Sequence, residues 1–401
     1  MIQWKIPLTD IELGIRQRLA VAEVLKSRWP RANGVVQAFE WALAKYLGAG
    51  HAVAVSSGAA ALHLGLKVLG LKEGDEVICP SFSFAATANA ILHTGATPVF
   101  AEISGLDDLT LSPADLEEKI NPRTRAIVAV HYGGYPCRMA SILELARRHH
   151  LFVVEDAAQA VGAEYAGRRC GTLGDIACVG FFADEGGILI TDNPLWASKA
   201  RLLRSHGMTP AGRGCDLGYD MLDLGLNCRM DEVRAALGLS QLETLEENNF
   251  SRTKKVQRYR ELLRNLKGVR LPFAQANGHR PAPSLFPIIL DEEIDRDQFV
   301  SSMREAGLQT GLHYPAIHQL SYYRRRWPDL RLPLTECASR REVTLPLFPS
   351  LSQGQIELIV KKVGGALKDC RGQSPAKKKP PVKPTHRLPR ERQTGQRHII
   401  L

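Results

Sequence analysis

Several short segments that follow apolar runs of the sequence carry residue types able to bind a ligand. Residues 56–60, Ser-Ser-Gly-Ala-Ala, come after an expected strand and open an expected helix. Free backbone N–H groups at a helix N-terminus attract phosphate, and Gly58 allows close approach of the backbone to a ligand. The same residues also suit an ordinary helix start, so this segment alone leaves both interpretations open.

An acidic and an aromatic residue stand after two further apolar runs. Asp156 closes an expected strand and is followed by Ala-Ala-Gln-Ala. In a cleft, its carboxylate could pair with a pyridinium nitrogen and make the ring an electron sink, whereas elsewhere it would simply cap a helix. Phe84 could lie flat on such a ring or belong to the hydrophobic core.

Alternating strands and helices must position these residues. The expected strands are His51–Val55, Glu76–Cys79, Thr97–Ala101, Ala126–His131, Leu151–Glu155, Ile176–Phe182 and Ile188–Thr191. The expected helices between them include Ala59–Leu69, Ala85–His93 and Met139–His149. This alternation predicts an α/β fold with a mostly parallel central sheet and helices on both faces. Such sheets bind ligands outside the carboxyl ends of their strands.

The remaining chain predicts a smaller C-terminal α/β domain and a tail. A long helical pattern spans residues 230–266, and the apolar run Ser284–Leu290 predicts a strand. Helices are expected over Arg296–Glu305 and Gln353–Lys368, with a loop over 311–349. We therefore expect a large domain over 1–245, a small domain over 246–370 and a disordered, proline-rich tail over 371–401.

Net charge, apolar content and cysteine spacing exclude several classes of function. The net charge is +10, but residues 371–401 hold nine Lys or Arg against one acid, so residues 1–370 carry only +2. The body therefore does not predict specific nucleic-acid binding. No apolar run is long enough for a membrane span, and the N-terminus lacks a signal peptide pattern, so a cytoplasmic protein is expected. The eight cysteines contain no C-x-x-C pair, which favours reduced thiols over disulfides or a metal site.

Many blocks, in order along residues 5–368, resemble the DegT/DnrJ/StrS family of pyridoxal-phosphate (PLP) enzymes that act on keto nucleotide sugars. The resemblance is carried by SSGAAALHLGL (56–66), VVEDAAQAVGAEYAGRRCGTLGDIA (153–177), LNCRMDEVRAALGLSQL (226–242) and GLHYPAIHQLSYYRRRWPDLRLP (311–333), among others. It implies the fold-type-I architecture of PLP-dependent transferases, with glutamate as amino donor. The last block is most similar to the branch that forms UDP-4-amino-4-deoxy-arabinose.

The resemblance also implies roles for individual residues. It places Gly58, Ala59 and Gly180 at the cofactor phosphate, Phe84 on the pyridine ring, Asp156 at the pyridinium nitrogen and Gln159 near the phenolic oxygen. Asn227 matches an asparagine that reaches the phosphate of the neighbouring subunit, which implies a homodimer, or a heterodimer with a paralogue. His313, Tyr314 and His318 match a substrate-side loop.

The sequence departs from the family pattern where the cofactor lysine is expected. Phe182 is followed by Ala-Asp and then Glu185, and no lysine occurs between Lys119 and Lys199. The family pattern has about half a dozen further residues here, including the lysine of the Schiff base. Ala59 and Gly180 also replace hydroxyl residues. The expectation is therefore that no catalytic lysine is present and that PLP binds weakly and without a covalent bond, if it binds at all.

Two functions follow for the body of the chain, and a third class, binding to nucleic acid or a membrane surface, rests on the basic tail alone. One is a nucleotide-sugar aminotransferase of polysaccharide or lipid A sugar biosynthesis, impaired by the missing lysine. The other is a non-catalytic homologue, acting as a partner subunit of an active paralogue or representing a decayed gene product. No metal site is expected in either case.

Overall fold

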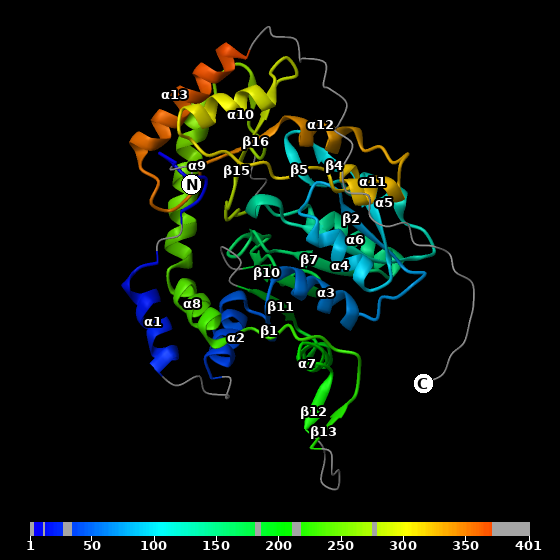
Figure 1. Cartoon of the computed structure of the whole chain (residues 1–401). Helices are drawn as coiled ribbons and strands as arrows, with labels where there is room; N and C mark the ends of the chain where they lie inside the picture. The colour runs from blue at the N-terminus through cyan, green and yellow to red at the C-terminus, as the bar shows by residue number, and fades with distance from the viewer. Residues whose placement is uncertain are drawn as a thin grey trace, which may run out of the picture.

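The computed structural model describes residues 4–10, 13–26, 34–180, 186–210, 218–274 and 279–370. A seven-stranded sheet forms the middle of the molecule (Figure 1). Its order is β1 (His51–Val55), β11 (Gly187–Thr191), β10 (Ile176–Gly180), β7 (Phe152–Asp156), β6 (Thr124–Val130), β2 (Glu76–Pro80) and β3 (Thr97–Ala101). Only β11 runs antiparallel to its neighbours, so the predicted mostly parallel sheet is confirmed.

Alternating side chains of these strands enter two separate layers of core, because successive residues of a strand face opposite sides. Val53 and Val55 pack under α3 (Gly58–Val68), α4 (Ala86–His93) and α7 (Pro194–Leu203). Ala52 and Ala54 face the other side. That side is covered by α2 (Gly34–Leu47), α5 (Pro113–Lys119), α6 (Met139–His149) and α8 (Glu232–Glu243). Helices therefore cover both faces, as the alternation predicted.

A second core lies in the upper part of Figure 1. It surrounds a three-stranded antiparallel sheet of β14 (Val269–Arg270), β15 (Phe286–Leu290) and β16 (Glu342–Leu345). Helices α9 (Leu245–Leu263), α10 (Arg296–Glu305) and α13 (Gln353–Asp369) pack on it. The N-terminal residue Ile6 is buried in this core too, and it forms a bridge to Leu308.

Two expectations for the C-terminal half are wrong. The helical pattern over 230–266 is two helices, because Thr244 leaves helical geometry (φ −107°) and ends α8 before α9 begins. The expected loop over 311–349 contains η2 (Ile317–Gln319), α11 (Ser321–Arg326), α12 (Pro333–Arg341) and β16. Helix α12 begins at Pro333, since a proline at the first position of a helix costs no hydrogen bond.

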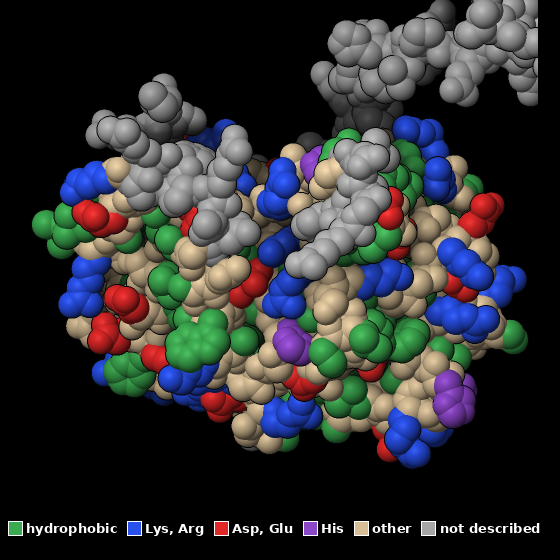
Figure 2. Space-filling model, turned by 90° about the horizontal axis from the view of Figure 1, so that it is seen from below, with side chains coloured by type: hydrophobic (Ala, Val, Ile, Leu, Met, Phe, Trp, Pro, Cys, Tyr) green, Lys and Arg blue, Asp and Glu red, His purple; other side chains and the backbone are tan. Residues whose placement is uncertain are grey.

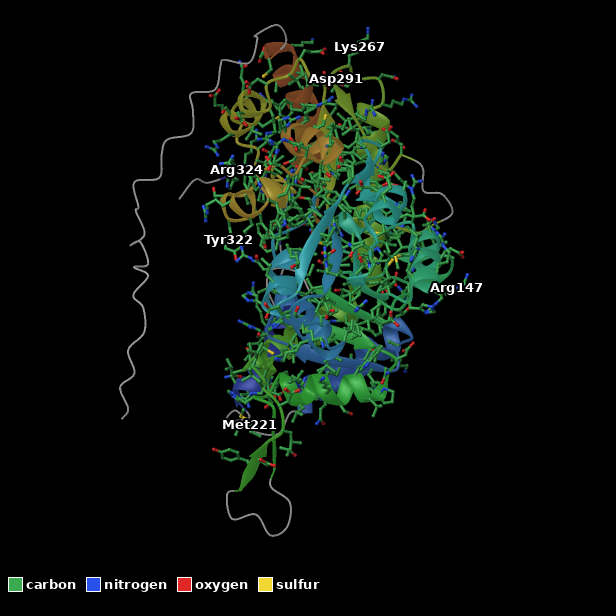
Figure 3. The ribbon with its side chains drawn as sticks, turned by 90° about the vertical axis from the view of Figure 1, so that its right-hand side faces the viewer. Arg147, Met221, Lys267, Asp291, Tyr322 and Arg324 are labelled. Atoms are coloured by element: carbon green, nitrogen blue, oxygen red, sulfur yellow. The ribbon has the colours of Figure 1, made fainter. Side chains whose placement is uncertain are left out.

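The smaller elements complete the chain. A hairpin of β12 (Met208–Pro210) and β13 (Tyr219–Met221) projects from the body, and Met221 is labelled on it in Figure 3. Helix α1 (Ile15–Lys26) packs against α8. The remaining short elements are β4 (Ile103–Gly105), β5 (Asp108–Leu111), β8 (Glu164–Tyr165), β9 (Arg168–Arg169) and η1 (Tyr132–Gly134). No helix within the described ranges has the length and apolar character needed to cross a membrane.

Candidate active site

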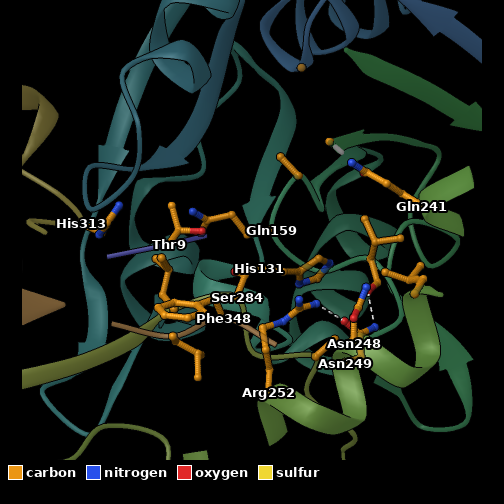
Figure 4. Close-up of a pocket in the computed structure, with 18 of the residues that line it drawn as sticks. Thr9, His131, Gln159, Gln241, Asn248, Asn249, Arg252, Ser284, His313 and Phe348 are labelled. Atoms are coloured by element: carbon orange, nitrogen blue, oxygen red, sulfur yellow. Dashed lines mark hydrogen bonds between the residues drawn. The ribbon is translucent and has the colours of Figure 1, made fainter. Parts of the chain in front are cut away.

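A cavity of about 810 Å³ opens between the carboxyl ends of the parallel strands on one side and β16 and α9 on the other (Figure 4). Its position is the one expected for a ligand site in an open α/β sheet. Most of the residues singled out from the sequence line this one cavity: Gly58, Ala59, Phe84, Asp156, Gln159, Gly180, His313 and Tyr314. The structure therefore brings together residues that lie up to 256 positions apart in the chain.

The N-terminus of α3 forms one wall of the cavity. The Ser57 side chain caps the helix by accepting a hydrogen bond from the Ala60 N–H at 3.1 Å. Ser57, Gly58 and Ala59 all line the cavity. The first N–H groups of a helix have no partner within the helix, so this turn is suited to an anionic group such as a phosphate.

Cys178 on β10 was not singled out from the sequence, yet it supports this turn. Its thiol donates to the Gly58 carbonyl at 3.1 Å. Burial raises the pKa of the Cys178 thiol well above its usual value, so the group stays protonated and able to donate at neutral pH. The expected strand over 176–182 already placed Cys178 and Gly180 on one face, which was the only signal available for it.

A close backbone approach joins the turn to β11. A Cβ built on Gly187 would lie 2.3 Å from the Ser57 carbonyl oxygen and 2.5 Å from the Gly58 nitrogen. Gly187→Ala is therefore expected to displace the start of α3 and to lower the free energy of unfolding by about 1–3 kcal/mol. The control is Gly365→Ala in α13, where nothing lies within 4 Å of the added Cβ. Thermal unfolding in which both variants match the parent protein would contradict this prediction.

Asp156 stands at the end of β7 with its carboxylate nearly buried. One carboxylate oxygen accepts from the Thr87 hydroxyl at 3.0 Å, and the other accepts from the Ala158 N–H at 3.3 Å. Burial raises the pKa of the Asp156 carboxyl, which means that its ionised form lacks stabilisation. A cationic nitrogen in the cavity would supply that stabilisation, since an opposite charge nearby favours the ionised form.

Tyr314 reaches across the cavity to two residues that follow strands of the sheet, Gln159 after β7 and Phe84 after β2. Its hydroxyl accepts a hydrogen bond from Gln159 Nε2 at 2.6 Å, and its ring lies 6.0 Å from the Phe84 ring. The other end of the Gln159 amide is held by the Gly133 N–H at 2.9 Å. Phe84 is 63% exposed, so its ring offers a free surface to a planar ligand.

Helix α9 provides the opposite end of the cavity, where Asn248, Asn249 and Arg252 lie together in Figure 4. The Arg252 guanidinium donates to the Pro283 carbonyl at 2.9 Å and to the Asn249 side chain. Burial lowers the pKa of Arg252 to about 10, so the group remains a cation at neutral pH. The sequence interpretation did not include these residues.

Two of the predicted site residues lie elsewhere. His318 is buried, and its ring nitrogens bond the Ser81 hydroxyl at 2.7 Å and the Glu336 carboxylate at 3.3 Å, so it joins the two parts of the chain from outside the cavity lining. Asn227 is exposed and forms a bridge to Ser205. Within one chain, Asn227 does not reach the cavity.

His131, Glu155 and Cys170 form a buried group with metal-binding residue types. Both Glu155 oxygens are already used, one by the His131 ring at 2.9 Å and by the Gly171 N–H, and the other by the Leu173 and Gly174 N–H groups. The second His131 ring nitrogen accepts from the Cys137 N–H at 3.1 Å. These bonds leave the imidazole no lone pair for a metal, so the group serves to hold the turn over 170–174.

No lysine is among the described residues that line the cavity. Strands β10 and β11 pair up to Gly180 and Gly187, which stand opposite each other. The junction between Phe182 and Glu185, where the family lysine is expected, lies outside the described residues. Lys199, the nearest lysine in the sequence, sits on α7 and is not part of the cavity lining.

Comparison with known proteins identifies the family of this chain. The chain matches the DegT/DnrJ/EryC1/StrS aminotransferase family over residues 13–364. It is 36% identical over 384 residues to the spore coat polysaccharide biosynthesis protein SpsC of Bacillus subtilis (strain 168), covering 92% of this chain and 97% of SpsC. This chain belongs to the DegT/DnrJ/EryC1/StrS aminotransferase family.

Solved structures of aminotransferases have the same fold. Helicobacter pylori PseC, an aminotransferase of pseudoaminic acid biosynthesis, superposes with a TM-score of 0.85 at 28% identity, covering 91% of this chain and 99% of PseC. S. venezuelae DesV superposes with a TM-score of 0.82 at 34% identity, covering 90% and 98% of the two chains. The predicted resemblance and the predicted transferase fold are therefore confirmed.

The cavity fits part of the cofactor that the DegT/DnrJ/EryC1/StrS family implies. The start of α3 suits the phosphate of PLP, Asp156 suits a pyridinium nitrogen, and the exposed Phe84 ring suits a stacked heterocycle. When bound, PLP supplies an electron sink for amino transfer. What the described lining lacks is the amine that would hold the aldehyde covalently.

Proposed function

We propose that this chain is a sugar aminotransferase homologue that holds PLP, or its amino form, without a covalent bond and is impaired in turnover. The observation that carries the proposal is a cavity with side chains for the ring and the phosphate but with no lysine among its described lining residues. In this proposal Asp156 keeps the ring nitrogen protonated, Gln159 and Tyr314 bond polar groups of the ligand, and α3 binds the phosphate.

The proposed substrates are a keto nucleotide sugar and glutamate, in the biosynthesis of a cell-surface polysaccharide or lipid A sugar. The cationic Arg252 at the far end of the cavity supports a substrate with an anionic portion, such as the diphosphate of a nucleotide sugar. The roles of SpsC in spore coat polysaccharide biosynthesis and of PseC in pseudoaminic acid biosynthesis support a sugar as the amino acceptor.

Cofactor binding tests this proposal. PLP is expected to bind the purified protein reversibly, measured by equilibrium dialysis, and to be lost on desalting. Asp156→Asn is expected to weaken binding roughly ten- to a hundredfold, because it removes a charge-assisted hydrogen bond to the ring. The control, Asp329→Asn, changes an exposed aspartate outside the cavity and should bind PLP like the parent protein. Equal affinity of the Asp156 variant and the parent would overturn the assignment.

A second role, as one subunit of a dimer, is favoured by the exposed position of Asn227 outside the cavity of its own chain. The chain leading to Asn227 presents a run of exposed apolar side chains: Tyr219, Met221, Leu222, Leu224 and Leu226. Figure 2 shows hydrophobic side chains exposed among charged ones on the face seen from below. An active paralogue as the partner would receive Asn227 at its own complete site.

Analytical ultracentrifugation checks the dimer. The protein is expected to sediment as a dimer at micromolar concentration, because an obligate interface in a protein of this kind buries more than roughly 2,000 Å². Leu222→Asp together with Leu224→Asp should shift the population to monomer by placing charge in an apolar contact. Arg264→Glu, a charge change at the residue that caps the C-terminus of α9, away from this segment, is the control. A parent protein that is monomeric throughout would contradict both dimer hypotheses.

A further inference from the structure

Three polar side chains of the small domain form a hydrogen-bonded chain that ends at the cavity. His313 Nδ1 lies 2.8 Å from the Thr344 hydroxyl, and the Thr344 hydroxyl lies 2.5 Å from Glu342 Oε1. The other Glu342 oxygen accepts the His313 backbone N–H at 2.8 Å. The sequence interpretation included His313 but not Thr344 or Glu342, and the arrangement makes the three residues one unit.

Backbone pairing holds this unit in place. Glu342 and Thr344 are two residues apart on β16, so their side chains share one face of the strand. Thr344 is also bridged to Gly311 by two backbone hydrogen bonds of 2.9 and 3.0 Å. This bridge fixes the segment that carries His313 beside β16. The short distances from the Thr344 hydroxyl to His313 Nδ1 and to Glu342 Oε1 therefore follow from the strand geometry.

The two ends of the unit differ in their access to the cavity. His313 and Thr344 line the cavity, whereas Glu342 lies behind them and is only 1% exposed. Among the described residues, His313 Nε2 has no hydrogen-bond partner, and His313 is labelled in Figure 4 among the residues that line the cavity. The His131 ring, which also borders the cavity, has both nitrogens engaged.

Burial shifts the pKa values of His313 and Glu342 and so determines their protonation states. It lowers the pKa of His313 to about 4, so the imidazole is neutral at neutral pH. It raises the pKa of Glu342 to about 8, against the weaker opposing effects of Thr344, the His313 N–H and Arg296 of α10. Tyr132 and Tyr314 also face Glu342, and both phenols stay protonated because burial raises their pKa values.

Because the Thr344 hydroxyl has a single proton, the protonation state of Glu342 sets the tautomer of His313. An ionised Glu342 accepts from the Thr344 hydroxyl, which then accepts from His313 Nδ1–H and leaves a lone pair on Nε2. A protonated Glu342 donates to Thr344, which donates to Nδ1 and leaves the proton on Nε2. His313 Nε2 therefore faces the cavity as a base when Glu342 is ionised and as an acid when Glu342 is protonated.

We propose that His313 is the proton-handling group of this cavity and that Thr344 and Glu342 are the positioning residues that set its tautomer. The proposal rests on the proposed function, since it assigns a proton acceptor to a site whose described lining has no lysine. In the step, a proton passes from a ligand atom to Nε2, the Nδ1 proton passes to the Thr344 oxygen, and the Thr344 proton passes to Glu342. Three bonds to hydrogen form and three break, and the imidazole remains neutral throughout.

Nitrogen NMR of the whole protein, labelled with ¹⁵N-histidine and without cofactor, tests the unit directly. His313 is assigned by its loss in His313→Gln. In the parent protein, the proton is expected to move from Nε2 to Nδ1 as the pH rises through the pKa of Glu342. Glu342→Gln should remove this exchange at every pH, Thr344→Val should remove it as well, and Thr344→Ser should restore it because serine keeps the hydroxyl.

A single tautomer across the whole pH range in the parent, or the same exchange in Glu342→Gln, would overturn the proposal. The result is separable from the proposed function because no cofactor is present. Movement of the His313 ring proton without PLP binding would support the role of Thr344 and Glu342 but contradict the proposed function. PLP binding without movement of the His313 ring proton would support the proposed function but contradict the role given to Thr344 and Glu342.

Discussion

Borohydride reduction of the protein saturated with PLP is expected to leave no pyridoxyl group on any lysine. The reason is that no lysine occurs between Lys119 and Lys199 and that none lies among the described residues lining the cavity. Peptide mass mapping after reduction is the measurement. Amino transfer from glutamate should also be at least about 10²–10⁴-fold slower than in a lysine-bearing relative, since loss of a general base alone costs that much.

Lys199→Arg provides the matched control for this experiment. Lys199 lies on α7 outside the cavity lining, so the variant should retain the same PLP affinity and the same residual rate as the parent. A pyridoxyl group found on Lys199, together with loss of activity in the arginine variant, would show that this lysine reaches the cofactor. The prediction of a non-covalent site would then be wrong.

Glu342→Gln is expected to stabilise the protein at alkaline pH. Burial raises the pKa of Glu342 from 4.5 to about 8 in the folded state. A carboxyl with a raised folded-state pKa contributes its full stability below the unfolded pKa and loses it as the pH rises through the folded pKa. At about 1.4 kcal/mol per pKa unit, the parent should lose up to roughly 5 kcal/mol between about pH 4.5 and pH 8.

The glutamine variant has no such dependence at this position, so its advantage should grow over that range and then level off. The value is an upper bound, because the surroundings of a buried charge relax. Chemical denaturation at a series of pH values measures the difference, with Glu357→Gln, an exposed change on α13, as control. A constant difference between Glu342→Gln and the parent at all pH values would contradict a raised pKa.

The local sequence was sufficient for most of the elements of the sheet. Strand β1 and helices α6 and α10 have the predicted bounds, because apolar periodicity and capping residues act over a few positions. Apolar periodicity did not predict the break between α8 and α9 at Thr244. It also did not predict α11, α12 and β16, which replace the expected loop. In these places, packing against the rest of the protein selects among conformations that the local sequence allows.

The resemblance named residues of the candidate site, but only the folded chain groups them. Gly58, Phe84, Asp156 and Gln159 share one cavity, as predicted, because the parallel strands place their carboxyl ends at one edge of the sheet. His318 also matched the family pattern, yet its side chain bonds Ser81 and Glu336 outside the cavity lining. The cofactor roles of the grouped residues stay predictions.

The sequence by itself determined the family, the alternation of strands and helices, and the absence of any lysine between Lys119 and Lys199, because these are properties of residue order. Tertiary structure alone decided which side chains meet. It placed Cys178 beneath the start of α3, Arg252 at the far end of the cavity, and Glu342 behind His313 and Thr344. The physical reason is that these contacts depend on strand register, burial and the meeting of distant segments, and each of those arises only when the chain is folded.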